Sequence, residues 1–447
     1  MENRFVKSTY LVDAAMADGS RRYLSTLLLS IVELDAQHVA LLEHCHEQPL
    51  SNENLDVLCH LRRLGLARFQ DEDEFAGVWQ QIEQWRGYQF LSVVLCLTFA
   101  CNFRCVYCYE RPSAPAVPSK QLMSPETASA ILGWMNDVMR TRNIDSARIT
   151  FFGGEPLICY SLIQGVLEQS ATLLKCEHLE INMSTNGYLL APGKIETLHS
   201  LGLRRLQLTL DGPSQVHDRR RPLASGRGTF HVITRNLVAC LDHGIGVDLL
   251  TVCDDDNVGS LFSLVDVLSK LVSDPQMRGA IHWSFTLVEP SESCAGRSAQ
   301  LLLGKERRLA EAVHEARIYA RKAGFNVVFP YSSNICARQL DYTFGIGPQG
   351  EIYPCFGVYG NPRYSIGNIS ESFDTVEQKS KQWARRDCFD EECVSCEVLP
   401  LCRGSRCQHM AAQLNGGAFA QKYCEKQLLL EDIKRSLSSS LACSPAP

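Results

Sequence analysis

The chain lacks any apolar run long enough to cross a lipid bilayer. Its longest apolar stretches lie near Leu27–Val32 and Phe90–Ala100, and both are interrupted and much shorter than the roughly 20 residues that a spanning helix needs. The N-terminal segment, MENRFVKSTYLVDAAMADGS, also lacks the apolar core and cleavage site of a signal peptide. These absences argue against a membrane protein and predict a cytoplasmic location with no membrane partner.

A dense basic tract is also absent, and neither sign of charge is in large excess. Lysine and arginine number 44, aspartate and glutamate number 50, and the net charge is −6. Binding along a phosphate backbone needs clustered positive charge, so nucleic acid is not an expected partner. The hydrophobic content of 45% is typical of a globular protein, and 447 residues exceed one ordinary core, so two or three domains are expected.

Cysteine, in contrast, is abundant. Twenty cysteines are many for a cytoplasmic protein, in which disulfides are rare. Those that stand alone in helix-like or strand-like patterns are predicted to pack as small apolar side chains: Cys45, Cys59, Cys96, Cys159, Cys176, Cys240, Cys253 and Cys294. Most of the others gather in two fields, and clustered cysteines indicate metal binding.

Three blocks follow one another along the chain. Residues 1–88 carry short strand-like runs, helices expected from Asp35 and Asn52, and an acidic turn, which together suit a small winged-helix-like domain. Residues 89–325 alternate helical stretches with strand-like segments: FLSVVLCLTF, ARITFF, LEINMST, RRLQLTL, GVDLLTV and IHWSFTLV. This alternation predicts parallel strands with crossover helices, and six such units predict an α/β fold, a partial (β/α)6 TIM-like barrel.

Helix signals support the barrel. Ser124 precedes an expected helix over Pro125–Arg140, and others are expected over Phe230–His243 and Lys305–Lys322. The third block, residues 326–430, is rich in Cys, Gly and Pro and poor in periodicity, which predicts a domain held by metal. Residues 431–447 are predicted to be a flexible tail.

The first cysteine field, CNFRCVYCYE, begins at Cys101 and follows the first strand of the middle block. In parallel α/β folds the chemistry lies at the carboxyl ends of the strands. Closely spaced thiolates select zinc or iron–sulfur clusters. Structural zinc needs four protein ligands, whereas a four-iron cluster held by three cysteines leaves one iron open to a small molecule.

The spacing Cys101-x3-Cys105-x2-Cys108, with Tyr107 before the last cysteine, resembles the signature of radical S-adenosylmethionine (SAM) enzymes. In that family SAM occupies the open iron, and its reductive cleavage yields a 5′-deoxyadenosyl radical that abstracts hydrogen from the substrate. The resemblance implies a [4Fe-4S] cluster at these cysteines and SAM as cofactor. It also implies a reducing partner such as flavodoxin or ferredoxin.

Further segments at strand ends resemble the cofactor-binding motifs of the family: FFGGEPL, MSTNG and LTLDGP. The glycine pair lets the backbone approach a ligand closely. By resemblance, the SAM contacts are Tyr107, Gly153, Gly154, Glu155, Ser184 and Thr209. For Thr209, a strand-end residue capping its own backbone is an open alternative. The run HDRRR, residues 217–221, is interpreted as a solvated charged loop in preference to a partner of the cofactor carboxylate.

The second cysteine field resembles the SPASM extension of peptide-modifying members of the family, so the resemblance covers residues 89 to about 430. That module carries two auxiliary clusters, which gives three [4Fe-4S] clusters in all. By resemblance the outer cluster is held by Cys393, Cys396, Cys402 and Cys424. The inner cluster, nearer the radical site, is held by Cys336, Cys355 and Cys407.

One spacing departs from the family pattern. CRGSRC places four residues between Cys402 and Cys407, where the family usually has three, so Cys407 is the less certain ligand. The fourth site of the inner cluster is either open to a substrate sulfur or filled by Cys388. An open site is favoured because Cys388 lies outside the recognised spacing. Two zinc sites would use the same thiolates and are an alternative.

The N-terminal block is similar to leader-recognition domains, which bind a precursor peptide as an added strand. A plain decoration of the barrel is the alternative. The resemblances together imply a maturase that installs a thioether, carbon–carbon or carbon–oxygen cross-link in a ribosomally made precursor peptide with a leader. An anaerobic sulfatase-maturing enzyme, which forms formylglycine, and a non-catalytic zinc-binding scaffold are alternatives. No proton-transfer residue stands out in the middle block.

Overall fold

The computed structural model describes residues 4–47, 51–108, 122–288, 299–328, 340–383, 390–403, 424 and 426–439. The chain divides into two compact units. The first unit consists of Met1–Arg86, Phe329–Cys336 and Asp387–Pro447, and the second of Gly87–Val328 and Ala337–Arg386.

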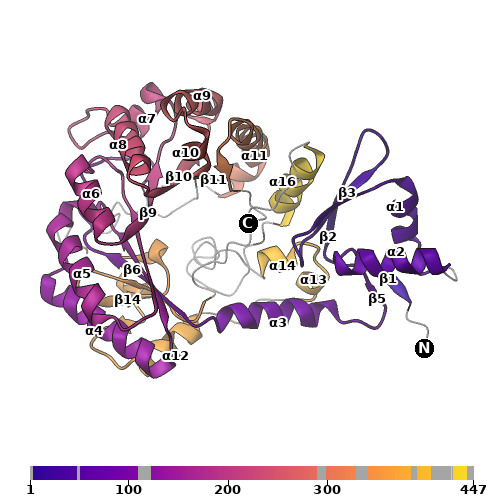
Figure 1. Cartoon of the computed structure of the whole chain (residues 1–447), viewed down its shortest axis with the longest axis horizontal. Coiled ribbons are helices and arrows are strands. Elements are labelled where there is room, and N and C mark those ends of the chain that lie inside the picture. Colours follow the sequence, from indigo (N-terminus) through magenta and orange to yellow (C-terminus); the bar gives the residue numbers. More distant parts are fainter. Residues whose placement is uncertain are drawn as a thin grey trace. The chain divides into compact units, whose positions relative to one another are not determined.

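In the described part of the second unit, ten strands form one sheet in the order β12-β11-β10-β9-β8-β7-β6-β13-β14-β15 (Figure 1). From β6 to β12 each strand lies parallel beside the one before it, and β13 adds parallel to β6. The strands are β6 (Phe90–Cys96), β7 (Ser146–Phe152), β8 (His178–Ser184), β9 (Leu203–Thr209), β10 (Gly246–Cys253), β11 (Ile281–Leu287), β12 (Asn326–Val327), β13 (Thr343–Ile346), β14 (Glu351–Tyr353) and β15 (Gly367–Asn368). All six strands expected in the middle block are present, and the sheet is an open, partial barrel.

Helices connect the parallel strands and cover the outer face of the sheet. They are α4 (Pro125–Arg142), α5 (Tyr160–Leu173), α6 (Pro192–Ser200), α7 (Ser214–Arg220), α8 (Phe230–Asp242), α9 (Leu261–Leu271), α10 (Pro275–Gly279), α11 (Ala299–Lys322) and α12 (Phe373–Trp383). The expected start of α4 is confirmed, because the Ser124 hydroxyl accepts from the Thr127 backbone N–H and Pro125 occupies the first turn.

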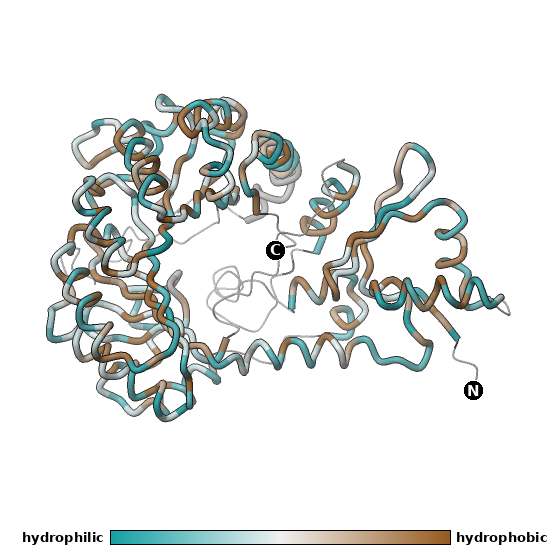
Figure 2. The backbone as a smooth tube through the Cα atoms, in the orientation of Figure 1, coloured by the Kyte–Doolittle hydropathy of each residue, from teal (hydrophilic) through white to brown (hydrophobic). Residues whose placement is uncertain are grey.

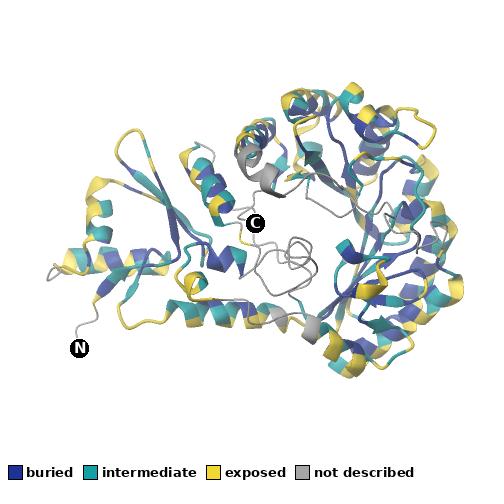
Figure 3. Ribbon diagram, turned by 180° about the vertical axis from the view of Figure 1, so that it is seen from behind, coloured by how far each residue is buried: buried dark blue, intermediate teal, exposed yellow. Residues whose placement is uncertain are grey.

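The two faces of the sheet differ in burial. Buried and half-buried residues alternate along β10, because successive side chains point to opposite faces and the helices cover one of them (Figure 3). The less buried face carries charged side chains, including the Arg205–Asp248 ion pair at 2.6 Å. The barrel interior is therefore polar, and the apolar core lies between the sheet and the helices.

The first unit is built on antiparallel strands. The sheet β2 (Leu11–Ala15), β3 (Arg21–Ser25) and β4 (Ile31–Leu34) is accompanied by the pair β1 (Phe5–Lys7) and β5 (Ala67–Phe69). Helices α1 (Ala36–Glu43) and α2 (Asn52–Arg63) begin after the caps Asp35 and Ser51, as the sequence predicts. One core contains Phe5, Leu11, Tyr23, Leu42 and Leu58.

A third helix of this unit, α3 (Glu74–Arg86), was not expected from the sequence. It follows the acidic turn and buries Val78 and Ile82, which lie four residues apart on one face. Hydrophobic and hydrophilic residues alternate along it (Figure 2).

The described C-terminal residues belong to the first unit. They form α13 (Glu391–Val394), α14 (Leu399–Cys402) and α16 (Lys426–Ser438). Leu429, Ile433 and Leu437 of α16 pack with Val12 and Leu24 of the N-terminal sheet. The prediction of a flexible tail is wrong for residues 431–438, because this stretch of α16 has an apolar face to bury. Residues 440–447 lie outside the described residues.

Candidate cluster and cofactor site

The site lies at the carboxyl ends of consecutive parallel strands. The cysteine loop follows β6, the GGE turn follows β7, and residues 185–187 follow β8. Asp211 and Asp254 follow β9 and β10. Because the strands are parallel and adjacent, these loops meet at one edge of the sheet.

The cysteine loop presents half-buried thiols at Cys101, Cys105 and Cys108. Cys101 Sγ accepts from the Phe103 backbone N–H at 3.4 Å. Burial raises the pKa of the Cys101 thiol to about 12, and the neighbouring charges of Cys105 and Cys108 add to the rise. A cation bound at this loop would oppose the rise and favour the thiolate, which is the form that ligates iron.

Among the described residues, no three His, Cys, Asp or Glu side chains gather closely enough to hold a single metal ion. A four-iron cluster gives each iron its own thiolate, so its ligands stand further apart than those of one ion. Three thiols on one short loop, with a backbone N–H directed at sulfur, fit such a cluster.

The glycine pair of the GGE turn packs directly against the start of the cysteine loop. A Cβ on Gly153, which has φ +128°, would lie 2.3 Å from the Thr98 carbonyl oxygen. A Cβ on Gly154 would lie 2.5 Å from that of Ala100. Gly154 N–H donates to Thr98 at 2.9 Å, and Glu155 N–H donates to Ala100 at 3.0 Å. The close approach made by these glycines is thus to the chain's own backbone.

The Glu155 side chain is fully buried and joins two loops of the site. Its carboxylate accepts from Thr185 Oγ1 at 2.7 Å, from the Asn186 N–H at 2.8 Å and from the Leu157 N–H at 3.0 Å. Burial raises the pKa of this carboxyl group, and the three hydrogen bonds oppose the rise. Asn186 in turn donates to Asn102 Oδ1 at 2.7 Å, so the β8 loop also contacts the cysteine loop.

Two other predicted cofactor contacts lie at strand ends. Ser184 Oγ donates to Gln207 Oε1 on the next strand at 2.9 Å. Thr209 is buried and pairs with Leu250 of β10. Their predicted contacts with SAM stay predictions.

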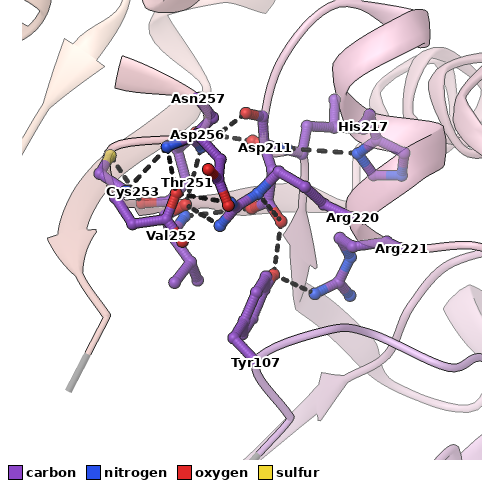
Figure 4. A network of polar contacts seen from close by, with 12 residues as sticks. Tyr107, Asp211, His217, Arg220, Arg221, Thr251, Val252, Cys253, Asp256 and Asn257 are labelled. Atoms are coloured by element: carbon purple, nitrogen blue, oxygen red, sulfur yellow. Dashed lines mark hydrogen bonds and ion pairs between the residues drawn. The ribbon is translucent and has the colours of Figure 1, made fainter. Parts of the chain in front are cut away.

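A buried network of charged groups holds Tyr107 (Figure 4). Tyr107 Oη donates to Asp211 Oδ2 at 2.6 Å and accepts from Arg221 Nη1 at 2.7 Å. Burial raises the pKa of Tyr107 well above its usual value, so the hydroxyl keeps its proton and remains a donor. Arg220 Nη1 pairs with Asp254 Oδ1 at 2.6 Å, and its Nε lies 3.5 Å from Asp211.

The interpretation of HDRRR as a solvated loop is wrong. His217, Arg220 and Arg221 are buried, and only Arg219 of the three arginines is exposed. Burial lowers the pKa of His217 well below its usual value, and Nδ1 of this neutral ring accepts from the Asp211 N–H at 3.2 Å. The burial of these residues could have been predicted from their position, because the run closely follows the end of a parallel strand.

The auxiliary cysteines fall into both units. Cys355 follows β14 in the second unit, and its sulfur accepts from the Gly357 N–H at 3.3 Å. The outer set lies in the first unit and consists of Cys393, Cys396, Cys402 and Cys424. Burial raises the pKa of the Cys396 thiol, and the nearby Cys424 adds to the rise. The remaining predicted positions lie outside the described residues: Cys336, Cys388 and Cys407.

The isolated cysteines match the packing prediction only in part. Four of them are buried: Cys45, Cys96, Cys240 and Cys253. Cys159 and Cys176 are half-buried, and Cys294 lies outside the described residues. The prediction is wrong for Cys59, which is exposed because it lies on the polar face of α2.

Residues 95–266 match the family model of the radical SAM superfamily. This part of the chain is therefore a radical SAM domain, which makes the chain an enzyme. The match covers the cysteine loop and the ends of β7 to β10, and it favours a catalytic role over a zinc-binding scaffold. No helix in the described residues is long and apolar enough to span a membrane.

Two characterised relatives show how far the sequence similarity extends. The chain is 24% identical over 357 residues to the AdoMet-dependent heme synthase of Nitratidesulfovibrio vulgaris, covering 73% of this chain and 89% of that one. It is 22% identical over 345 residues to the radical SAM cyclopropyl synthase TigE of Paramaledivibacter caminithermalis, covering 71% and 68%.

Two solved structures share the fold. The anSMEcpe structure with bound AdoMet and the Cp18Cys peptide matches with a TM-score of 0.59 at 17% identity, covering 78% of this chain and 98% of that one. Streptococcus suis SuiB bound to the precursor peptide SuiA matches with a TM-score of 0.54 at 14% identity, covering 94% and 99%. At these identities the likeness concerns the fold.

Proposed function

We propose that the chain is a maturase that installs a thioether, carbon–carbon or carbon–oxygen cross-link in a ribosomally made precursor peptide. The observation that carries the proposal is the antiparallel sheet β2-β3-β4, which has open edges among the described residues, in one chain with a radical SAM domain. The likeness to SuiB, solved with its precursor peptide, supports it because it extends over 94% of this chain. The leader is assigned to the first unit and the chemistry to the second.

Strand β4 offers backbone groups to an added peptide strand. In an antiparallel pair, hydrogen-bonded residue pairs alternate with non-bonded pairs. Ser25 N–H donates to the Ser30 carbonyl at 2.9 Å, so Val32, two residues on, is also bonded to β3. The backbone groups of Ile31 and Glu33 consequently point away from β3. A leader that pairs there would extend the sheet by one strand.

The residues at the carboxyl ends of β6 to β10 suit a [4Fe-4S] cluster at Cys101, Cys105 and Cys108, with SAM beside it. When bound, these groups supply a carbon radical that removes a hydrogen atom from the substrate. Arg221 Nε is buried without a hydrogen-bond partner among the described residues. Its guanidinium is therefore a proposed partner for the carboxylate of SAM, in addition to the contacts expected from the sequence.

Cross-link formation removes two hydrogens from the peptide. One leaves as a hydrogen atom and the other as a proton, with one electron passed on. Cys336, Cys355 and Cys407 are the proposed ligands of an inner auxiliary cluster, which would accept that electron, and the outer cysteine set would hold a second cluster. A flavodoxin or ferredoxin is the proposed source of the electron that starts the reaction.

The test uses the anaerobically reconstituted full chain, dithionite, SAM and a synthetic peptide encoded by a short reading frame beside the gene. The expected product has lost two hydrogens, resists digestion at the cross-link and does not react with a hydrazide. The triple variant Cys101→Ala, Cys105→Ala, Cys108→Ala should be inactive. A hydrazide-reactive product would favour the formylglycine-forming alternative, and an unmodified peptide despite SAM cleavage would contradict the proposal.

Tetrapyrrole modification is a second candidate, because the similarity to a heme synthase covers 73% of this chain. Heme formed from a porphyrin precursor under the same conditions, detected by absorption spectroscopy, would favour it over peptide maturation.

A further inference from the structure

The cysteine loop is paired along its length with residues 220–224. Val106 N–H donates to the Arg220 carbonyl at 3.0 Å, and Arg104 N–H donates to the Pro222 carbonyl at 2.9 Å. A bridge joins Phe103 to Leu223, and the Ala224 N–H donates to the Asn102 carbonyl at 2.8 Å. The backbone on both sides of Cys105 is therefore held by the segment that follows α7.

Asp211 lies at the centre of the side-chain contacts behind this pairing. It is fully buried, and its carboxylate accepts from Tyr107 Oη at 2.6 Å and from the Val252 N–H at 3.1 Å. Its backbone carbonyl accepts from Asn257 Nδ2 at 2.7 Å, and its N–H donates to His217. Asp211 thus joins the end of β9, the end of β10 and the cysteine loop (Figure 4).

The buried charges around Asp211 are balanced. Arg220 and Arg221 contribute two positive charges, and Asp211 and Asp254 contribute two negative ones. The Arg220 guanidinium also lies 5.1 Å from the centre of the Tyr107 ring. Because a buried charge without a partner is costly, this set resists displacement of any one member. The side chain of Tyr107 connects this set to the segment between Cys105 and Cys108.

We propose that Asp211 is a positioning residue for the cluster. Through the Tyr107 hydroxyl it fixes the segment between Cys105 and Cys108 against the end of β9, and the pair Arg220–Asp254 fixes Asp211 in turn. The inference rests on the proposed cluster site at these cysteines. It is independent of the substrate, because it concerns only how the loop is held.

The test is a double-mutant cycle of Tyr107→Phe and Asp211→Ala in the reconstituted full chain. Readouts are iron content, the electron paramagnetic resonance spectrum of the reduced cluster, and uncoupled cleavage of SAM. Each single variant should alter the spectrum and slow cleavage about tenfold or more, as expected for loss of a hydrogen bond to a charged group. The double variant should lose little more than Asp211→Ala alone, because Asp211→Ala already lacks the contact with the Tyr107 hydroxyl. Asp211→Asn should restore much of the rate, because its amide oxygen can accept from Tyr107.

Arg219→Gln is the matched control, since Arg219 is the exposed neighbour of Arg220 and should behave as the wild type. Additive losses, or a Tyr107→Phe variant with the spectrum and cleavage rate of the wild type, would overturn the inference. If Asp211→Ala does not fold, Tyr107→Phe still tests the proposal, because this variant removes only a hydroxyl group. An unaltered cluster signal and cleavage in the triple cysteine variant would instead refute the cluster site itself.

Discussion

At the residue scale, Gly154 is the position where a single methyl group should stop the chemistry. A Cβ there would lie 2.5 Å from the Ala100 carbonyl oxygen and 2.7 Å from that of Phe99, so Gly154→Ala must push the cysteine loop away from β7. We expect loss of SAM cleavage and of most iron at the first cluster. Gly165→Ala in α5 is the control, because its Cβ meets nothing within 4 Å. That change should leave cleavage intact and stabilise the helix by up to about 1 kcal/mol.

The sequence predicts the loop positions of this site better than the roles of its side chains. The cysteine triplet, the GGE turn and Thr209 all lie at carboxyl ends of strands, because a short spacing after an apolar run is a local signal. The partners of Tyr107 were not predicted. Asp211 and Arg221 come together through the contact of two strand ends with α7. Such tertiary contacts cannot be inferred from the spacing of residues along the sequence.

At the element scale, the edge strand β4 should govern leader binding. Glu33→Pro removes an outward-facing N–H and leaves the pairing with β3 in place, as proline at a sheet edge allows. We expect leader affinity to fall by up to about tenfold, the size of one lost hydrogen bond. Glu33→Ala keeps the N–H and loses only the contacts of the side chain with Arg22 and Ser20, so its affinity should stay near that of the wild type. Fluorescence anisotropy with a labelled leader peptide measures both, and equal affinities would exclude β4 as the docking edge.

Helix α12 should contribute stability that depends on pH. Burial raises the pKa of Glu377, but hydrogen bonds from Lys381 and Arg142 outweigh this and lower it below 4.5. Its ion pairs, including the one at 2.9 Å with Arg142 of α4, are therefore fully formed above that pH and are lost as the pH falls through the lowered value. Glu377→Gln should cost about 1 kcal/mol at neutral pH. Thermal unfolding should show this difference shrinking below about pH 4.5, and a constant difference would contradict the assignment.

Strands were easier to predict than the helices near the chain's ends. All six middle strands carry strong apolar patterns, because the sheet is covered by helices on one face. Helices α3 and α16 bury narrower stripes, such as Val78 with Ile82 and Ile433 with Leu437. These stripes are flanked by polar and charged residues, so the apolar pattern in the sequence is too weak to predict the two helices.

At the scale of the whole molecule, the first unit combines segments from both ends of the sequence. The sequence suggests a recognition block at one end and a cysteine-rich module at the other. The structure places residues 390–403 and 426–439 with the N-terminal sheet, and Tyr10 Oη donates to the Val394 carbonyl at 3.0 Å. Thr26 Oγ1 likewise donates to the Glu397 carbonyl at 2.5 Å. The outer cysteine set is thereby built into the unit assigned to the leader, a non-local pairing that the sequence does not record.

This shared core makes a C-terminal substitution act on the N-terminal sheet. Ile433 of α16 is fully buried among residues of β2 and β3, so Ile433→Ala should destabilise the first unit by about 2–5 kcal/mol through the cavity it leaves. Amide hydrogen exchange in β2 and β3 should speed up, although these strands precede Ile433 by some 400 residues. Lys434→Ala is the matched control, because its side chain is exposed one position further along the same helix. Unchanged exchange in β2 and β3 would mean that the two ends fold independently. Faster exchange would imply that deletion of residues 1–86 exposes Leu429, Ile433 and Leu437 to water and removes packing that supports the outer cysteine set.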